Sequence, residues 1–220
     1  MTGSPSPYRA GARRAATIAP AVLVFGASFG LLAQSAGMGA FASVVMSATT
    51  FAGSAQFAAV SVLSAAGSVG AAATAAILLN ARYVPIGISV ASVLRGGPLR
   101  RLLEAQLVVD ESWAFARRRD GSFDRGVLIG AGLVLYTCWL VGTAAGALGG
   151  EAFGDPDSLG LDGAFAALFL ALLVLQINSR RGLAAALLGG TIAFVLVPFA
   201  APGVPIIAAT AGCLVGWRAR

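Results

Sequence analysis

Several polar residues lie within or at the edges of long apolar runs, where a polar group is costly and usually marks a functional position. They are Gln34, Ser54, Gln56, Asn80, Arg82, Tyr83, Gln176 and Asn178. Arg82 is the most costly, because an arginine at the centre of a membrane helix is unfavourable by about 2.5–3.5 kcal/mol. It should therefore face the interior of a helical bundle and meet an acid or backbone carbonyls. In the alternative, the helix ends near Asn80 and Arg82 extends to the membrane surface, and Pro85 favours such an end.

Two adjacent acids, Asp110 and Glu111, form the second notable group. They lie among apolar residues such as Leu107 and Trp113, which a fully hydrated loop would not need. One interpretation is an amphipathic helix at the membrane surface with its acids toward water. The other is that at least one acid reaches the bundle interior, as the counter-charge of Arg82, as a proton carrier or as a ligand for an ammonium group. Arg82, Asp110 and Glu111 are therefore the expected ion-coupling or charge-network residues.

The segment Gly53-Ser54-Ala55-Gln56 interrupts an apolar run and has the parts of a transporter binding site. A discontinuous helix exposes N–H groups on one side of the break and carbonyls on the other, which suit an anionic and a cationic group. Phe51 and Phe57 would add an apolar wall, so a zwitterion with a hydrocarbon side chain fits. The expected substrate-binding residues are Phe51, Gly53, Ser54, Gln56, Phe57 and Asn80. In the alternative, Gly53 and Ser54 only allow close helix packing.

The residue types exclude much enzyme chemistry. The chain has no histidine, and all 15 of its basic residues are arginine. Schiff-base catalysis by lysine, a Ser-His dyad and a histidine metal site are therefore excluded. The two cysteines, Cys138 and Cys213, are expected to be packing residues. We expect no enzyme activity, no metal and no cofactor.

The elements that must position these residues are membrane helices. Apolar residues make up 58 % of the 220 residues and charged residues 11 %, and the mean hydropathy is +0.85, outside the range of soluble domains. The apolar runs are 18–36, 40–66, 69–94, 127–149, 163–177, 183–200 and 204–217. A helix needs about 20 residues to span a bilayer. We therefore predict an all-α, polytopic membrane helical bundle of about six to eight transmembrane segments, forming one domain over 1–220.

The arginines predict the topology, because cytoplasmic loops are enriched in them. Arginines cluster in the N-terminal tail 1–16, in the polar segment 95–126, at 180–181 and at the C-terminus, whereas 150–162 carries four acids and no arginine. Both termini and 95–126 should thus be cytoplasmic or interfacial, and 150–162 external. The net charge of +6 indicates membrane lipids rather than nucleic acid as the charged partner. The expected location is the cytoplasmic (inner) membrane.

The first half of the chain contains an odd number of apolar runs. Three runs lead from a cytoplasmic N-terminus to a segment, 95–126, that should also be cytoplasmic, and three crossings would leave it outside. Either one run enters the membrane without crossing, or 102–117 forms an additional crossing. The interruptions at Gly53 and at Asn80–Pro85 favour broken or re-entrant helices in this half, because irregular backbone at membrane depth must be buried or line a wet cavity.

Small residues spaced four apart predict close helix packing. The pairs are Gly26/Gly30, Gly126/Gly130, Gly142/Gly146, Gly146/Gly150 and Gly212/Gly216.

The polar motifs, taken in order, resemble those of a known family. Gly30-Leu-Leu-Ala-Gln34, Met46-Ser47, the run from Phe51 to Phe57, Asn80-Ala-Arg82-Tyr83 and Asp110-Glu111-Ser112 are similar to the N-terminal half of the AzlC family, the large subunit of branched-chain amino acid exporters. The likeness covers roughly 17–120, and the second half matches only as a hydrophobic pattern. Tyr83 departs from the family pattern, in which a histidine is expected after the arginine.

The resemblance implies export of branched-chain amino acids, with methionine as a further substrate, together with a small membrane partner of the AzlD type. The chain has no Gly-x-x-x-x-Gly-Lys phosphate-binding motif, so a secondary transporter driven by the proton gradient fits better than an ATP-driven pump. The alternative is a channel-like pore subunit for an unrelated solute, whose flux would not saturate and would not depend on the proton gradient.

Overall fold

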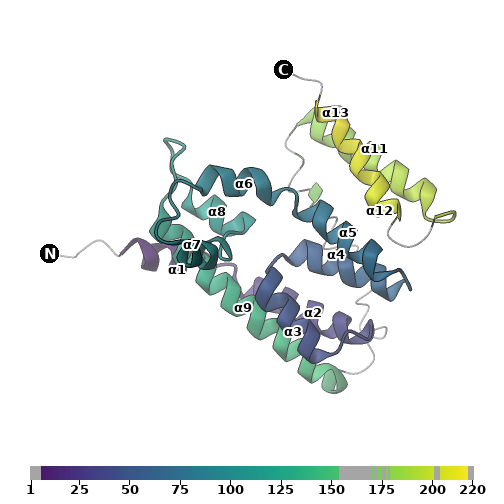
Figure 1. The fold of residues 1–220 in the computed structure, drawn as a ribbon, viewed down its shortest axis with the longest axis horizontal. Helices are drawn as coiled ribbons and strands as arrows, with labels where there is room; N and C mark the ends of the chain where they lie inside the picture. Colours follow the sequence, from purple (N-terminus) through teal and green to yellow (C-terminus); the bar gives the residue numbers. More distant parts are fainter. Residues whose placement is uncertain are drawn as a thin grey trace. The chain divides into compact units, whose positions relative to one another are not determined.

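The computed structural model is helical (Figure 1). The structure describes residues 6–153, 170, 173–174, 177, 179–200 and 204–217. Within these ranges every regular element is a helix, apart from one isolated antiparallel bridge between Arg117 and Phe123. The all-α prediction is therefore confirmed for the described part of the chain.

The chain divides into two compact units, which are described separately. The first unit comprises Met1–Gln56 and Asn80–Ala152. Its helices are α1 (Pro7–Ala16), α2 (Ala19–Ser35), α3 (Ala40–Thr50), α6 (Tyr83–Val90), α7 (Pro98–Ala105), α8 (Asp110–Ala116) and α9 (Arg125–Phe153). This unit holds nearly all of the polar residues that the sequence marks.

The second unit comprises Phe57–Leu79 and Phe153–Arg220. It contains most of α4 (Gly53–Ser64) and α5 (Val69–Asn80), and all of α11 (Arg180–Leu196), α12 (Val204–Ala209), the 3-10 helix η1 (Thr210–Cys213) and α13 (Leu214–Trp217). Helix α11 packs closely against η1, since a methyl group on Gly212 would lie 2.6 Å from the carbonyl oxygen of Ala185. Most of the expected crossing over 163–177, together with Gln176, Asn178 and most of the acidic segment 150–162, lies outside the described residues.

Helix α9 is the longest element in the described residues and the clearest candidate for a membrane span. Its segment Arg125–Gly149 has 25 residues and a mean hydropathy of 1.9, and 25 residues of α-helix extend about 37 Å, more than the hydrocarbon core. In the described ranges the pairs α1–α2 and α5–α6 reach spanning length only when each is counted across a bend. The described residues thus contain one to three candidate spans, and the six to eight crossings stay a prediction.

Prolines explain two of the helix breaks. Pro20 lies in the first turn of α2, and its ring would clash with the carbonyl of Ala16, so α1 ends there and the chain bends by 63°. Pro85 lies in the first turn of α6, where it would clash in the same way with Ala81 if α5 continued. The predicted interruption at Asn80–Pro85 is therefore confirmed.

The third break divides the run 40–66 between α3 and α4. Phe51 ends α3 in the left-handed conformation, with φ +39°, which is unfavourable for a residue with a side chain by about 1–2 kcal/mol. Helices α3 and α4 have 11 and 12 residues, about 17 Å each, or half of the hydrocarbon core. The predicted break is present, two residues before Gly53.

The alternative of an additional crossing over 102–117 is not found. Helix α7 ends at Ala105 and α8 begins at Asp110. Two helices of eight and seven residues each extend only about 12 Å. Gly132 on α9 packs against the carbonyl of Leu107 in the connection between them, so the segment folds onto the start of the long helix instead of forming a span.

Glycines allow α2 and α9 to touch along their length. Gly26 and Gly30 face the backbone of α9, and Gly142 and Gly146 face the backbone of α2, so that a methyl group at any of the four would collide with a carbonyl oxygen. Gly130 makes a similar approach to α1. The predicted close packing is confirmed at these glycines and at Gly212, in agreement with the small-residue rule for membrane helices.

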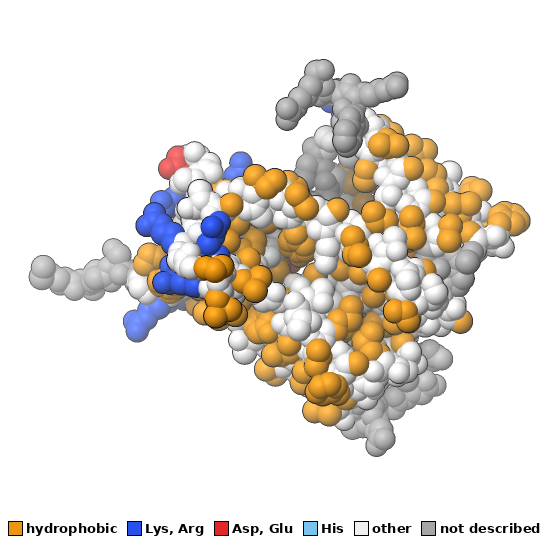
Figure 2. All heavy atoms as spheres, in the orientation of Figure 1, with side chains coloured by type: hydrophobic (Ala, Val, Ile, Leu, Met, Phe, Trp, Pro, Cys, Tyr) orange, Lys and Arg blue, Asp and Glu red, His pale blue; other side chains and the backbone are white. Residues whose placement is uncertain are grey.

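Hydrophobic side chains cover much of the visible surface, and arginines gather at the end formed by α1 and α7 (Figure 2). Several large apolar side chains are strongly exposed, among them Phe41, Ile88 and Phe199. Such a surface suits lipid and not water.

Candidate functional site

The α3–α4 and α5–α6 breaks meet at a cavity. Its volume is about 250 Å³, slightly below the range of about 300–1,000 Å³ for pockets that hold drug-sized ligands. It is lined by Thr50, Phe51 and Ala52 from the α3–α4 break, by Asn80, Tyr83, Gly87, Val90 and Leu94 from the α5–α6 break and α6, and by Ala105, Gln106 and Val108. The cavity is therefore suited to a small molecule with both polar and apolar parts.

Arg82, in the α5–α6 break, contacts both other elements that the sequence marked. Its Nη2 atom donates a hydrogen bond to Ser54 Oγ at 2.8 Å and forms an ion pair with Asp110 Oδ2 at 3.0 Å. The guanidinium also lies 5.3 Å from the centre of the Tyr83 ring, within reach of a cation–π interaction. The side chains of Arg82 and Asp110 are 37 % and 31 % exposed, so the pair lies at the edge of the packed interior.

Two buried polar atoms beside this pair lack partners. In the described part of the chain, Asn80 Oδ1 and Arg82 Nε are buried and make no hydrogen bond. One is an acceptor and the other a donor on a cationic group. Buried polar groups are nearly always satisfied, and each of these atoms keeps one hydrogen-bonding capacity that no group in the described residues uses.

Ser47 is the centre of a fully buried polar network behind the α3–α4 break. Its hydroxyl oxygen accepts hydrogen bonds from Gln56 Nε2 at 2.9 Å and from Trp139 Nε1 at 3.2 Å, and lies 2.9 Å from Thr143 Oγ1. Because a hydroxyl has two lone pairs and one proton, Ser47 must donate to Thr143. Gln56 Oε1 accepts from the backbone N–H of Ala52 at 3.3 Å, so Gln56 links α4, the break and, through Ser47, α9.

The end of α3 is capped by side chains from distant elements. Gln106 Nε2 donates to the carbonyls of Ala48 and Thr49 at 3.1 and 2.9 Å, and the hydroxyl of Tyr136 donates to Ala48 at 2.9 Å. The ring of Phe51 packs edge-on against Tyr136, with centres 5.1 Å apart. The carbonyls that a helix end leaves without partners are thus partly satisfied.

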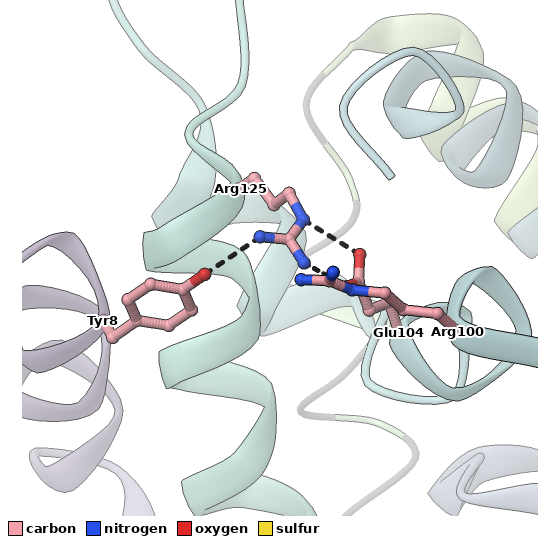
Figure 3. Close-up of polar contacts among 4 residues, drawn as sticks. All are labelled: Tyr8, Arg100, Glu104 and Arg125. Atoms are coloured by element: carbon pink, nitrogen blue, oxygen red, sulfur yellow. Dashed lines mark hydrogen bonds and ion pairs between the residues drawn. The ribbon is translucent and has the colours of Figure 1, made fainter. Parts of the chain in front are cut away.

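A second charge cluster joins α1, α7 and α9 (Figure 3). Glu104, on α7, is 7 % exposed and accepts two hydrogen bonds from Arg125, one of them at 2.9 Å from Nε. Arg100 Nε donates to the same carboxylate at 2.9 Å, and Arg125 Nη1 donates to the hydroxyl of Tyr8 at 2.9 Å. The hydrogen bonds from Arg125 hold the pKa of Glu104 below its ordinary value. This cluster fixes α7 to the first turn of α9.

The structure brings some of the expected site residues together. Phe51 and Asn80 line the cavity. Ser54 does not line it, but accepts a hydrogen bond from Arg82. Gly53 packs against the Trp139 ring, with a methyl group there meeting the ring at 3.0 Å, as the close-packing alternative expects. Gln56 is fully buried within the Ser47 network, and Phe57 is buried in the second unit.

The charged residues answer one question that the sequence left open. Helix α5 ends at Asn80, as one alternative expects. Arg82 nevertheless pairs with an acid, as the other alternative expects. The acid in the ion pair is Asp110, at the first position of α8, whereas Glu111 follows it on the same helix.

Sequence reasoning missed several residues that hold the site. They are Ser47, Glu104, Gln106, Arg125, Tyr136 and Thr143. Thr143 and Tyr136 lie in the apolar run 127–149, where the rule applied to Gln56 would have identified them. Glu104 and Arg125 are 21 residues apart, and no local pattern pairs them.

Residues 17–153 match the family described as AzlC protein. The chain is 28 % identical over 157 residues to the branched-chain amino acid transport protein AzlC of Bacillus subtilis, covering 70 % of this chain and 61 % of that protein. It is 30 % identical over 202 residues to an uncharacterised membrane protein of Archaeoglobus fulgidus, covering 86 % and 85 %. A membrane protein of Helicobacter pylori is 27 % identical over 176 residues, covering 79 % and 77 %.

No solved structure matches the chain. The family match includes the α3–α4 and α5–α6 breaks, the Arg82–Asp110 pair and the long helix α9. The chain therefore belongs to the AzlC family and has a role in membrane transport.

Proposed function

We propose that this chain is the substrate-binding subunit of a secondary transporter that exports branched-chain amino acids, and methionine as a further substrate, across the cytoplasmic membrane. The observation that carries the proposal is the Arg82–Asp110 ion pair, whose residues lie close in the chain to Tyr83 and Val108 of the cavity lining. An α-amino acid is a zwitterion, and this pair offers one counter-charge for its carboxylate and one for its ammonium group. The transport protein of Bacillus subtilis supports the substrate class.

The unpartnered atoms suggest how the amino acid binds. The carboxylate would accept a hydrogen bond from Arg82 Nε, and the ammonium group would donate to Asn80 Oδ1 and to Asp110. Ser54 holds the guanidinium in place at 2.8 Å. The aliphatic side chain would lie against Phe51 and the other apolar residues of the cavity. Direct contacts of Gln56 and Phe57 with substrate stay predictions, since Gln56 is engaged in the Ser47 network.

The same acid can couple transport to the proton gradient. A carboxylate that binds either a proton or an ammonium group exchanges one for the other. On the cytoplasmic side an ionised Asp110 would bind the amino acid, and on the outer side protonation of Asp110 would release it. Glu111, the next residue, is the second acid that could share this role. The proton and the amino acid then bind Asp110 in turn, so that proton entry is coupled to amino acid export.

The proposal includes the topology and the partner expected from the sequence. Both termini and the 95–126 segment are cytoplasmic, and a small membrane protein of the AzlD type covers part of the exposed apolar surface. A cysteine at position 118, in a background without Cys138 and Cys213, should react with an impermeant reagent only from the cytoplasmic side, and a cysteine at position 156 only from outside. Full export by this chain alone would contradict the need for a partner.

The transport assay uses the chain and its small partner together in vesicles with an imposed pH gradient. Leucine flux should saturate, depend on the gradient and be lost in Arg82→Gln and Asp110→Asn. The matched control is Arg118→Gln, which removes an ion pair with Asp124 of similar geometry (2.6 Å) in the loop after α8. Leucine and methionine should compete, whereas leucinol and isovaleric acid, each lacking one charged group, should not. Flux that is linear in concentration and independent of the gradient would favour the channel-like alternative.

A further inference from the structure

Helix α7 is folded with its apolar face outward. Leu99, Leu102 and Leu103 form one face of this helix and are 70 %, 68 % and 62 % exposed. Glu104, the acid of the same helix, is only 7 % exposed. A helix on the surface of a water-soluble protein shows the reverse arrangement. Water is therefore the wrong environment for this face.

The outward orientation is fixed by contacts and does not result from loose packing. Arg125 of α9 holds the Glu104 carboxylate with two hydrogen bonds (Figure 3). Rolling α7 to bury its leucines would expose Glu104 and leave Arg125 without its partner. Breaking one half of a buried ion pair is strongly unfavourable. The fold thus keeps the leucine face pointing away from the first unit.

The same ion pair fixes the depth of α7 in the membrane. Arg125 is the first residue of the spanning segment Arg125–Gly149. A helix bound to that residue lies at the level where α9 enters the bilayer. At that level the environment changes from headgroups to acyl chains within a few ångströms, and an amphipathic helix lies in the plane of the interface.

Two exposed arginines lie close in the sequence to the leucine face. Arg95 precedes α7 and is exposed, and the side chain of Arg100 is 62 % exposed. Arg100 uses Nε for Glu104, and its two terminal nitrogens make no hydrogen bond within the described residues. Figure 2 shows arginine and apolar side chains together at this end of the first unit. The charge is complementary to anionic phosphate groups.

We propose that α7 is a binding site for anionic phospholipids, with Leu99, Leu102 and Leu103 among the acyl chains and Arg95 and Arg100 on the lipid phosphates. These five residues are not among those that line the substrate cavity, although Ala105 at the end of α7 is. A protein partner on this face is the competing occupant, but it would require acids opposite the arginines and an apolar patch at the same depth. The lipid leaflet supplies both features at the depth that Arg125 sets.

The first test measures what covers the leucine face. In full-length protein without Cys138 and Cys213, an environment-sensitive fluorophore is attached at Leu102→Cys, and at Arg101→Cys on the opposite side of α7 as control. The protein is reconstituted in vesicles of phosphatidylcholine and phosphatidylglycerol. Spin-labelled lipid should quench the label at 102 and not at 101, and aqueous iodide the reverse. Equal quenching of the labels at 102 and 101 by iodide would overturn the proposal. A label at 102 that neither iodide nor the lipid quencher reaches would also overturn it, because a protein would then cover the leucine face. Unchanged thermal unfolding of both variants confirms that they are folded.

The second test measures lipid selectivity. Spin-labelled phosphatidylglycerol should associate with the protein more strongly than spin-labelled phosphatidylcholine. Arg95→Gln and Arg100→Gln should each lower that preference about fivefold, the effect of one arginine near an anionic surface. Arg118→Gln, in which the lost charge is already paired with Asp124, should lower it much less. Equal preference in all four proteins would show that the arginines do not bind anionic lipid, whatever the outcome of the transport assay.

Discussion

Replacing Gln56 by leucine tests whether the Ser47 network holds the α3–α4 break. The change keeps nearly the same volume but removes the hydrogen bond to Ser47 at 2.9 Å and strands the N–H of Ala52, which now donates to Gln56 Oε1 at 3.3 Å. A side-chain hydrogen bond within a membrane protein contributes about 0.6–1.7 kcal/mol, and a stranded buried donor costs about 1–3 kcal/mol. The free energy of unfolding should therefore fall by about 2–4 kcal/mol.

The matched control is Gln34→Leu. Gln34 is another glutamine that donates to α9, through a single hydrogen bond to the carbonyl of Ala147 at 2.8 Å. Its replacement leaves no buried backbone donor without a partner, so the free energy of unfolding should change by about 1 kcal/mol or less. Both variants are unfolded by titrating a denaturing detergent into mixed micelles, and leucine flux is measured per folded molecule.

Two outcomes would refute this reasoning. If Gln56→Leu is as stable as Gln34→Leu, the network does not hold the break. If Gln56→Leu keeps its stability but loses leucine flux, Gln56 contacts the substrate directly, as the sequence alone suggested. Loss of stability with normal flux per folded molecule would assign Gln56 to positioning the break.

Three further predictions follow from other contacts. In a double-mutant cycle of Arg82→Gln and Asp110→Asn, the free energies of unfolding should show a coupling of about 1 kcal/mol, because about a third of each side chain is exposed. Additive effects of the two replacements would contradict the pairing. Gly146→Ala should destabilise the protein by about 1–3 kcal/mol, because the added methyl group overpacks against α2. The control Gly190→Ala, with open space around the glycine, should leave stability unchanged. Equal melting temperatures of the two variants would refute close contact of α2 and α9. Because the folded state lowers the pKa of Glu104, its ion pair should stabilise the protein fully at neutral pH and lose that effect as pH falls below about 4.3; Glu104→Gln should lower stability at pH 7 and narrow its difference from the parent in acid.

The sequence predicts the helix breaks because their causes are local. Pro85 cannot continue a helix begun at Val69, and the small and polar residues after Phe51 weaken the run 40–66. The pairing of Arg82 with an acid is also predictable, since a charge at membrane depth needs a partner and Asp110 is one of few acids available.

Other features depend on contacts between distant residues. The hydrophobic pattern of α7 alone does not specify which way its leucines face, and the ion pair of Glu104 with Arg125 holds them outward. Gln106 looks like an ordinary polar residue in a loop, and its role appears only when α3 ends beside it. Local patterns specify where helices stop, whereas the direction that a short helix faces is decided by residues elsewhere in the chain.

The backbone at Phe51 bears on how the cavity could change during transport. Any rearrangement that returns Phe51 from φ +39° to the right-handed or extended region gains about 1–2 kcal/mol, a factor of about 5–30 in population. The contacts of its ring with Tyr136 and of its neighbours with Gln56 oppose that change. The α3–α4 junction is therefore a strained point about which the two short helices can move. A ligand that weakens those few contacts needs to supply little free energy to shift the population toward a second arrangement of α3 and α4.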